Sequence, residues 1–314
     1  MLLWLWLFFP NPTLEPIKLE TLGTYQSLHL QLFKCGDQFL ALVANEPRLT
    51  LFNAQGKISS VYSQSGHGAE DLHKPQFLGA TTDRLYILSD HRRLLVFDHR
   101  LKLLKSTDSG LPPYITQGLL FGNCLGKDHF LLYTFLQNNH LLHQATLEKF
   151  FRIERSLYRH DTNLDARGTY QWLHRNRHFV ADMVPADSDF YLVQVRDVLK
   201  DDSKERPILT ELVAPIDSFN RGNFPERAIL SEMVFTGEGY IVELAETPAK
   251  GFKGTDPYAS LVFFWDYFNT QGTNLKREQA GDRRLKPVRN SVEVFMVESG
   301  ENDTEFLVPF HPDK

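Results

Sequence analysis

Residues 75–105, PQFLGATTDRLYILSDHRRLLVFDHRLKLLK, are the stretch that decides the fold class. They contain four short apolar runs with turn residues between them: Pro75–Gly79, Arg84–Ser89, Arg93–Asp98 and Lys102–Lys105. Runs of this length, bounded by Thr, Asp and His, predict β-strands rather than amphipathic helices. Four such strands in immediate succession predict one antiparallel sheet with tight turns between neighbouring strands.

The same unit recurs along the chain. Apolar runs that match its second strand begin at intervals of 46, 45, 49, 61 and 54 residues, at Phe39, Leu85, Phe130, Phe179, Tyr240 and Val294. A repeat of about 45 residues with four strands in each unit is typical of a β-propeller. The sequence therefore predicts an all-β fold, a β-propeller, and six blades fit the count.

The two ends of the repeat region predict how the ring closes. The last repeat, from about Arg289 to Phe310, has room for only two or three strands, and a β-like stretch, Pro16–Thr21, precedes the first repeat. A terminal blade that lacks a strand can take one from the other end of the chain, which covers two open sheet edges. We therefore expect one domain, residues 16–314, closed by an N-terminal strand that completes the last blade.

Residues 1–15 form a separate apolar segment. The run from Leu2 to Phe9 is far shorter than the ~20 residues that span a bilayer. It also lacks the preceding Lys or Arg and the following small-residue cleavage site of a secretory signal. Three interpretations stay open: the end of a signal that begins upstream, a retained anchor that docks on a membrane or partner through Trp4 and Trp6, or a segment that folds back onto the body.

The composition excludes several classes of protein. With 42% hydrophobic and 12% aromatic residues among 314, the chain is neither disordered nor a disulfide scaffold. A net charge of −5, spread along the chain, disfavours a nucleic-acid partner held by a general phosphate-neutralising surface. Cys35 and Cys124 are interpreted as two small buried residues, and one bridge between them stays open if the protein is exported. The sequence carries no nucleophile elbow, P-loop, dinucleotide-binding or zinc-protease motif.

One repeat resembles a known family. Its features are a glycine-containing loop at Gly66–Leu72, a Pro that opens the inner strand at Pro75, and a strand that ends in Asp at Leu85–Asp90. An Arg-led strand that ends in Phe-Asp follows at Arg93–Asp98, and an outer apolar run at Leu101–Leu104. This pattern resembles one repeat of the NHL-type six-bladed β-propellers and is similar to bacterial six-bladed propellers often found in the cell envelope. The resemblance implies a binding platform, with a minority of such proteins acting as metal-dependent lyases, lactonases or hydrolases.

Histidines raise the possibility of a metal site. His67, Asp71 and His73 share one glycine-containing loop, and Zn²⁺ accepts two imidazoles and a carboxylate. The alternative is that the glycines only permit a turn with positive φ. His174 and His178 have helical ligand spacing, but on one strand they would lie ~13 Å apart and could not share an ion.

Three further segments are candidates for contact surfaces. Residues 276–289 carry six positive and two negative side chains, which we interpret as a solvated outer edge and loop, with an acidic lipid, RNA or acidic partner as the alternative. Residues 197–206 and 251–258 are long insertions of the kind that carry recognition on rigid scaffolds.

The sequence as a whole favours a non-catalytic protein-binding scaffold or accessory module of a cell-envelope or membrane-associated complex. Its partners would be proteins, with a membrane complex reached through Leu2–Phe9, and the periplasm or envelope would be its compartment, although the cytoplasm stays open. The alternative is a metal-dependent lyase or hydrolase with one divalent ion held by His67, Asp71 and His73 at the mouth of the propeller channel. The sequence identifies no organic cofactor and no small-molecule ligand.

Overall fold

The structure is a computed structural model that describes residues 16–24, 30–43, 47–124, 129–136, 139–147, 151–161, 169–174, 177–185, 190–197, 208–215, 228–236, 238–246, 261–289, 291 and 293–310. Over these residues it is all-β, apart from the short helices α1 (Leu19–Leu22) and α2 (Pro113–Thr116) and a 3-10 turn at Glu301–Asp303. The predicted all-β class is therefore confirmed. The segment 1–15 and the insertions 198–206 and 251–258 lie outside the described residues.

Four of the sheets contain four consecutive antiparallel strands each. They are formed by β6 (Gln76–Ala80), β7 (Leu85–Ser89), β8 (Arg93–Phe97) and β9 (Leu103–Asp108); by β10 (Leu119–Cys124), β11 (His129–Leu136), β12 (Asn139–Leu147) and β13 (Phe151–Asp161); by β14 (Thr169–His174), β15 (Arg177–Pro185), β16 (Phe190–Asp197) and β17 (Ile208–Pro215); and by β18 (Ala228–Phe235), β19 (Gly239–Glu246), β20 (Val262–Asn269) and β21 (Asn274–Gln279).

An eight-stranded sheet contains the first and the last strands of the described chain. Its order is β1-β24-β23-β22-β2-β3-β4-β5, with β1 (Ile17–Lys18), β24 (Glu305–Pro309), β23 (Val294–Ser299), β22 (Arg284–Arg289), β2 (Leu30–Cys35), β3 (Gln38–Val43), β4 (Arg48–Asn53) and β5 (Ile58–Tyr62). Strand β1 pairs antiparallel with β24 through Ile17↔Leu307 and Lys18↔Phe306. Strand β22 pairs parallel with β2 at only two positions, Leu32↔Val288 and Phe33↔Arg289.

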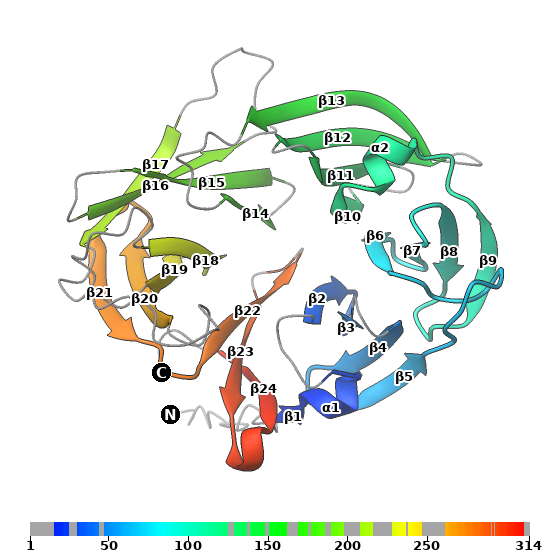
Figure 1. The fold of residues 1–314 in the computed structure, drawn as a ribbon, viewed down its shortest axis with the longest axis horizontal. Helices are drawn as coiled ribbons and strands as arrows, with labels where there is room; N and C mark the ends of the chain where they lie inside the picture. The colour runs from blue at the N-terminus through cyan, green and yellow to red at the C-terminus, as the bar shows by residue number, and fades with distance from the viewer. Residues whose placement is uncertain are drawn as a thin grey trace, which may run out of the picture.

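The sheets are arranged in a ring (Figure 1). Strands β2, β6, β10, β14, β18 and β22 lie nearest the centre, and the later strands of each sheet lie progressively further out. Because consecutive strands run in opposite directions, the β2–β3 turn lies on one rim of the ring, while the β3–β4 turn and the β5–β6 connection lie on the other.

The core consists of apolar layers between neighbouring sheets. One layer packs β2–β4 against β6–β8, and the rings of Phe33 and Phe77 stack there with centroids 4.1 Å apart. A second layer packs β6–β8 against β10–β13, where the ring of Phe130 meets Tyr86 and Phe151 edge-on. Because both faces of these sheets are covered, a central strand such as β7 is buried along its whole length.

The predicted strands of the second repeat correspond to β6–β9 within one to three residues at each end. Two expectations at the ends of the repeat region are wrong. The last repeat begins with β22 at Arg284 rather than near Arg289, and only Ile17–Lys18 of the stretch 16–21 is a strand, because the chain turns into α1 at Leu19. Leu19 and Leu22 are fully buried against the last sheet, so packing rather than strand propensity decides this conformation.

Two further expectations can be compared with the structure. Cys35 and Cys124 are both free thiols. Cys35 is buried as expected, and burial raises its pKa to about 12, whereas the expectation that Cys124 is buried is wrong, because it is only half-buried. Among the described residues, no helix has the length and apolar character needed to cross a bilayer.

Candidate functional site

The candidate site lies on one rim of the ring, where the connection from β5 to β6 meets the turn between β7 and β8. The connection covers residues 63–75, and the turn covers residues 90–92. Leu72 is the buried anchor of the connection, and its amide donates to the carbonyl of Gln64 at 2.7 Å. Most of residues 63–70 are exposed above this anchor.

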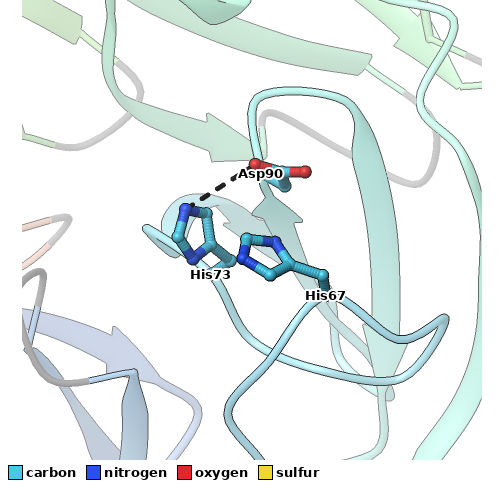
Figure 2. Close-up of side chains that lie close together, drawn as sticks. All are labelled: His67, His73 and Asp90. Atoms are coloured by element: carbon cyan, nitrogen blue, oxygen red, sulfur yellow. Dashed lines mark ion pairs between the residues drawn. The ribbon is translucent and has the colours of Figure 1, made fainter.

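Three potential metal ligands gather at this point (Figure 2). The imidazole rings of His67 and His73 lie with centroids 4.5 Å apart, and His73 Nε2 is 3.8 Å from Asp90 Oδ1. One ligand atom from each residue lies within 4.8 Å of the others. His67 is exposed, and His73 and Asp90 are half-buried.

Asp71, the carboxylate predicted to join the two histidines, has a different role. Its Oδ2 accepts a hydrogen bond from the Gly68 amide at 2.7 Å. A Cβ atom on Gly66 would lie 2.3 Å from Asp71 Oδ2, and one on Gly68 would lie 2.8 Å from it. The carboxylate thus fills the space that both glycines leave open, and the loop depends on glycine at each position. The structure brings His67 and His73 together and directs Asp71 at the loop backbone.

Asp90 is the carboxylate that sequence reasoning missed. Asp90 and His91 have φ of 55° and 54°, and the Arg92 amide donates to the Ser89 carbonyl at 3.2 Å, so the β7–β8 turn has positive φ at both central residues. The Asp90 amide also donates to the His73 carbonyl at 2.6 Å, which fixes the turn against the loop. The available signal was the Asp that ends an apolar strand on the same rim as the histidine loop.

The backbone of the loop is held by groups on neighbouring strands. Carbonyls of consecutive loop residues accept hydrogen bonds from scaffold side chains: Arg93 to His67 (3.4 Å) and Gly68, Ser106 to Ala69, Tyr62 to Glu70 (2.6 Å) and Ser89 to Asp71 (3.0 Å). Burial raises the pKa of Tyr62, with Glu70 and Asp71 adding to the shift, so its hydroxyl stays protonated as the donor at neutral pH. The loop is therefore both exposed and conformationally fixed.

Two imidazoles and a carboxylate are a donor set that suits Zn²⁺. Zinc binds such atoms at about 2.0–2.2 Å, so two of its ligand atoms lie no more than about 4.4 Å apart. A spacing of up to 4.8 Å means that small side-chain rotations must precede joint binding. The residues fit the ion in chemistry, and the exposed His67 leaves the position open to solvent.

Other histidines lie elsewhere in the structure. His174 ends β14, and His178 lies on β15, next to it in the hairpin with Leu173 as its partner, so the expectation that both lie on one strand is wrong. His143 on β12 is buried, its Nε2 lies 3.3 Å from Thr134 Oγ1, and burial lowers its pKa. We assign none of these residues to the candidate site.

The segment 276–289 is also different from its predicted outer edge and loop. Residues 274–279 form the outer strand β21, but residues 284–289 form the inner strand β22. Arg277 is paired with the buried carboxylates of Glu246 and Asp266, and Arg283 lies over the ring of Trp265. Several of these charges are engaged with the protein interior, so the segment is not one continuous solvated face.

Comparison with known proteins shows the fold. No described protein family matches the sequence, and no curated protein matches it. A Bacteroides vulgatus member of the DUF4221 family has a TM-score of 0.50 and 11% identity, covering 94% of this chain and 95% of that one. A candidate exported protein of Bacteroides fragilis has a TM-score of 0.53 and 11% identity, with coverage of 94% and 93%. The Nup133 β-propeller domain of Vanderwaltozyma polyspora has a TM-score of 0.46 and 8% identity, with coverage of 95% and 90%. The chain thus shares its fold with the two Bacteroides proteins over nearly the whole length of each.

We expect Arg93→Met to loosen the loop without unfolding the ring. The substitution removes two donors to loop carbonyls, which should lower the local opening free energy by about 1–2 kcal/mol and speed amide exchange in residues 66–71 by about 5- to 30-fold. Hydrogen–deuterium exchange measures this. Arg92→Met is the matched control, because Arg92 is exposed and its side chain pairs with Asp108 instead. Equal exchange in both variants would show that Arg93 does not hold the loop.

Proposed function

We propose that this protein is a non-catalytic protein-binding scaffold built on a six-bladed β-propeller. In this proposal the eight-stranded sheet is two blades that touch at the short β22–β2 contact. Strand β1 is then the outermost strand of the last blade. The parallel β22–β2 contact covers two residue pairs, whereas every other pairing in that sheet is antiparallel, which supports the division.

The observation that carries the binding function is the fixed loop at residues 63–75. An exposed loop has no need of a donor for each carbonyl, since water supplies one. Here Arg93, Ser106, Tyr62 and Ser89 fix consecutive carbonyls instead, and most of the side chains on residues 63–70 face solvent. A surface that is ordered before binding loses less conformational entropy when a partner docks. A rigid ring with a preordered rim loop is suited to protein recognition.

This proposal predicts that a change of charge on the loop weakens partner binding. Glu70 is exposed, and Glu70→Lys places a positive charge where the partner would face a negative one. The affinity for the partner should fall by about tenfold or more, since like charges brought together at an interface cost over about 1 kcal/mol. The affinity is measured by calorimetry with the protein that co-purifies with the wild type. Asp37→Lys is the matched control, because Asp37 is an exposed acid at the β2–β3 turn on the opposite rim. If both variants bind as the wild type does, this rim is not the contact surface.

We place the scaffold at the cell envelope, with Leu2–Phe9 as its docking element. The support is the apolar run itself, with Trp4 and Trp6 as residue types that favour a membrane interface. The neighbouring structures share only the fold with this chain.

Deletion of Leu2–Phe9 should leave the fold intact and weaken membrane association. The apolar side chains would supply the free energy of partition into the interface, so co-sedimentation with anionic phospholipid vesicles should fall severalfold. A variant with the same eight positions changed to Ser separates the effect of length from that of hydrophobicity. Unchanged sedimentation of both variants, with an unchanged unfolding transition, would remove the anchoring role.

A second candidate function is that of a metal-dependent lyase or hydrolase. The observation that favours it is the meeting of His67, His73 and Asp90 on one rim. Asp90 replaces the predicted Asp71 in this version, since the Asp71 carboxylate binds the loop amide. A bound divalent cation would polarise a substrate oxygen or lower the pKa of a water molecule.

The metal hypothesis predicts about one divalent ion per chain in protein purified without chelators. His67→Ala and His73→Ala should abolish zinc binding, and Asp90→Asn should weaken it by about 10- to 100-fold, because a neutral amide is a poorer ligand than a carboxylate. Elemental analysis and zinc titration measure these changes. His129→Ala, at an exposed histidine on β11, is the control. Wild-type protein that neither carries nor binds a divalent ion would leave the scaffold as the function.

A further inference from the structure

A cavity of about 420 Å³ lies among the inner strands of the ring. Its walls come from β2, β18, β19 and β22, with Phe263 of β20. These strands belong to the eight-stranded sheet and to the β18–β21 sheet, and they meet near the centre of the ring in Figure 1. The volume is within the range of small-molecule sites, about 300–1,000 Å³, and is too small for a folded partner.

One wall of the cavity is cationic. Arg284, Lys286 and Arg289 all line it, and all three come from β22. The guanidinium carbon of Arg284 lies 3.4 Å from the centroid of the Phe263 ring, and Arg284 Nη1 donates to the Gly281 carbonyl at 2.8 Å. Arg284 is therefore held in a fixed position at the edge of the cavity.

Lys286 lies in the middle of this wall. Within the described part of the chain, its ammonium has no hydrogen bond or ion pair at contact distance, and burial lowers its pKa. The charged groups that act on it are Glu232, Glu243, Arg289 and Glu305. Lys286 is half-buried, and the partial loss of hydration at its ammonium has a free-energy cost that a bound partner would offset.

Glu232 and Glu243 also line the cavity, and the oxygens of Glu243 are engaged with protein groups. Glu243 Oε2 accepts from Trp265 Nε1 at 2.8 Å and from the Leu285 amide at 2.9 Å, and Oε1 accepts from the Ser231 hydroxyl at 3.0 Å. Burial raises the pKa of Glu243, so the protonated form is more accessible there than in water. Glu243 is thus bound to its own sheet and to the backbone of β22 rather than to Lys286.

We propose that this cavity binds a small anionic ligand, one that carries a carboxylate or phosphate group, through Lys286 with Arg289 and Arg284 beside it. Three cationic and two acidic residues line the cavity, and the carboxylate of Glu243 is satisfied by the three donors from Trp265, Leu285 and Ser231. An anion would supply the partner that the Lys286 ammonium lacks, and charge-assisted hydrogen bonds are stronger in such a partly dehydrated site. This inference goes beyond the scaffold function and does not depend on it.

The structure also explains why the cavity has a polar inner wall. Strand β22 meets β2 at only two residue pairs, so its inner edge is unpaired by β2 over residues 284–287. Pro287 lies in this part, where a residue without an amide proton costs no ladder hydrogen bond. A ligand can therefore approach β22 from the centre of the ring without displacing a strand.

The first test is calorimetric titration of the full chain with inorganic phosphate and, separately, with succinate. Binding of phosphate alone identifies a phosphorylated ligand, and binding of succinate alone identifies a carboxylate ligand; either result, or both, supports the site. Lys286→Met should weaken the binding by about tenfold or more, because the substitution keeps the length of the side chain and removes its charge. Lys105→Met, at an exposed lysine on the outer strand β9, should bind as the wild type does. Absence of binding by both anions, or equal binding by both variants, would overturn the proposal.

The second test uses pH and does not depend on the folding of the Met variant. Because the pKa of Lys286 is lowered, wild-type affinity should fall at a lower pH than an ordinary lysine would allow, which a titration between about pH 8 and 10 follows. Both probes keep nearly constant charge over this interval. Lys286→Arg should keep its affinity across it, because a guanidinium stays protonated. Identical pH profiles for the wild type and Lys286→Arg would show that Lys286 does not receive the anion.

Discussion

The pairing of strands from opposite ends of the described chain is the constraint on which the remaining structure depends. β22 pairs with β2, and β1 pairs with β24, so the first and last repeats become one sheet. Without these contacts, β2 and β24 would each leave a row of unpaired backbone groups. The apolar layer of Leu19, Leu22, Phe39 and Phe295 between them would also be open to water. The rim site and the central cavity both depend on sheets held in this order.

Glu243 makes a second contact to β22. Its carboxylate joins Trp265 of the β18–β21 sheet to the backbone amide of Leu285, so a single buried side chain links neighbouring sheets. Trp265 is fully buried and meets the ring of Phe310 edge-on, which adds a contact from beyond the last strand. Along β22, Lys286 therefore lies between two contacts, the bond from Leu285 to Glu243 and the pair Phe33↔Arg289.

The strands could be predicted because their signals are local. Gln38–Val43, Leu85–Ser89 and Arg93–Phe97 are continuous apolar runs bounded by turn residues, and this pattern survives in the structure because both faces of each strand are buried. Residues 284–289 gave no such signal, since Arg and Lys alternate there with Leu, Pro and Val. The charges indicated an outer edge, but an inner strand beside a polar cavity has the same composition. The stretch 16–21 was likewise misjudged, because packing of Leu19 and Leu22 turns it into α1.

By itself, the sequence determined the all-β class, the spacing of the strands, and the presence of His67 and His73 in one glycine-containing loop. Each of these depends on residues close together along the chain. Only the tertiary structure decided that Asp90 rather than Asp71 lies beside the histidines, and that Lys286 lines one cavity with Glu232 and Glu243. The physical reason is that Asp71 finds its hydrogen bond three residues away, in the Gly68 amide, whereas the neighbours of Asp90 and Lys286 are set by how the strands and sheets come together in the ring.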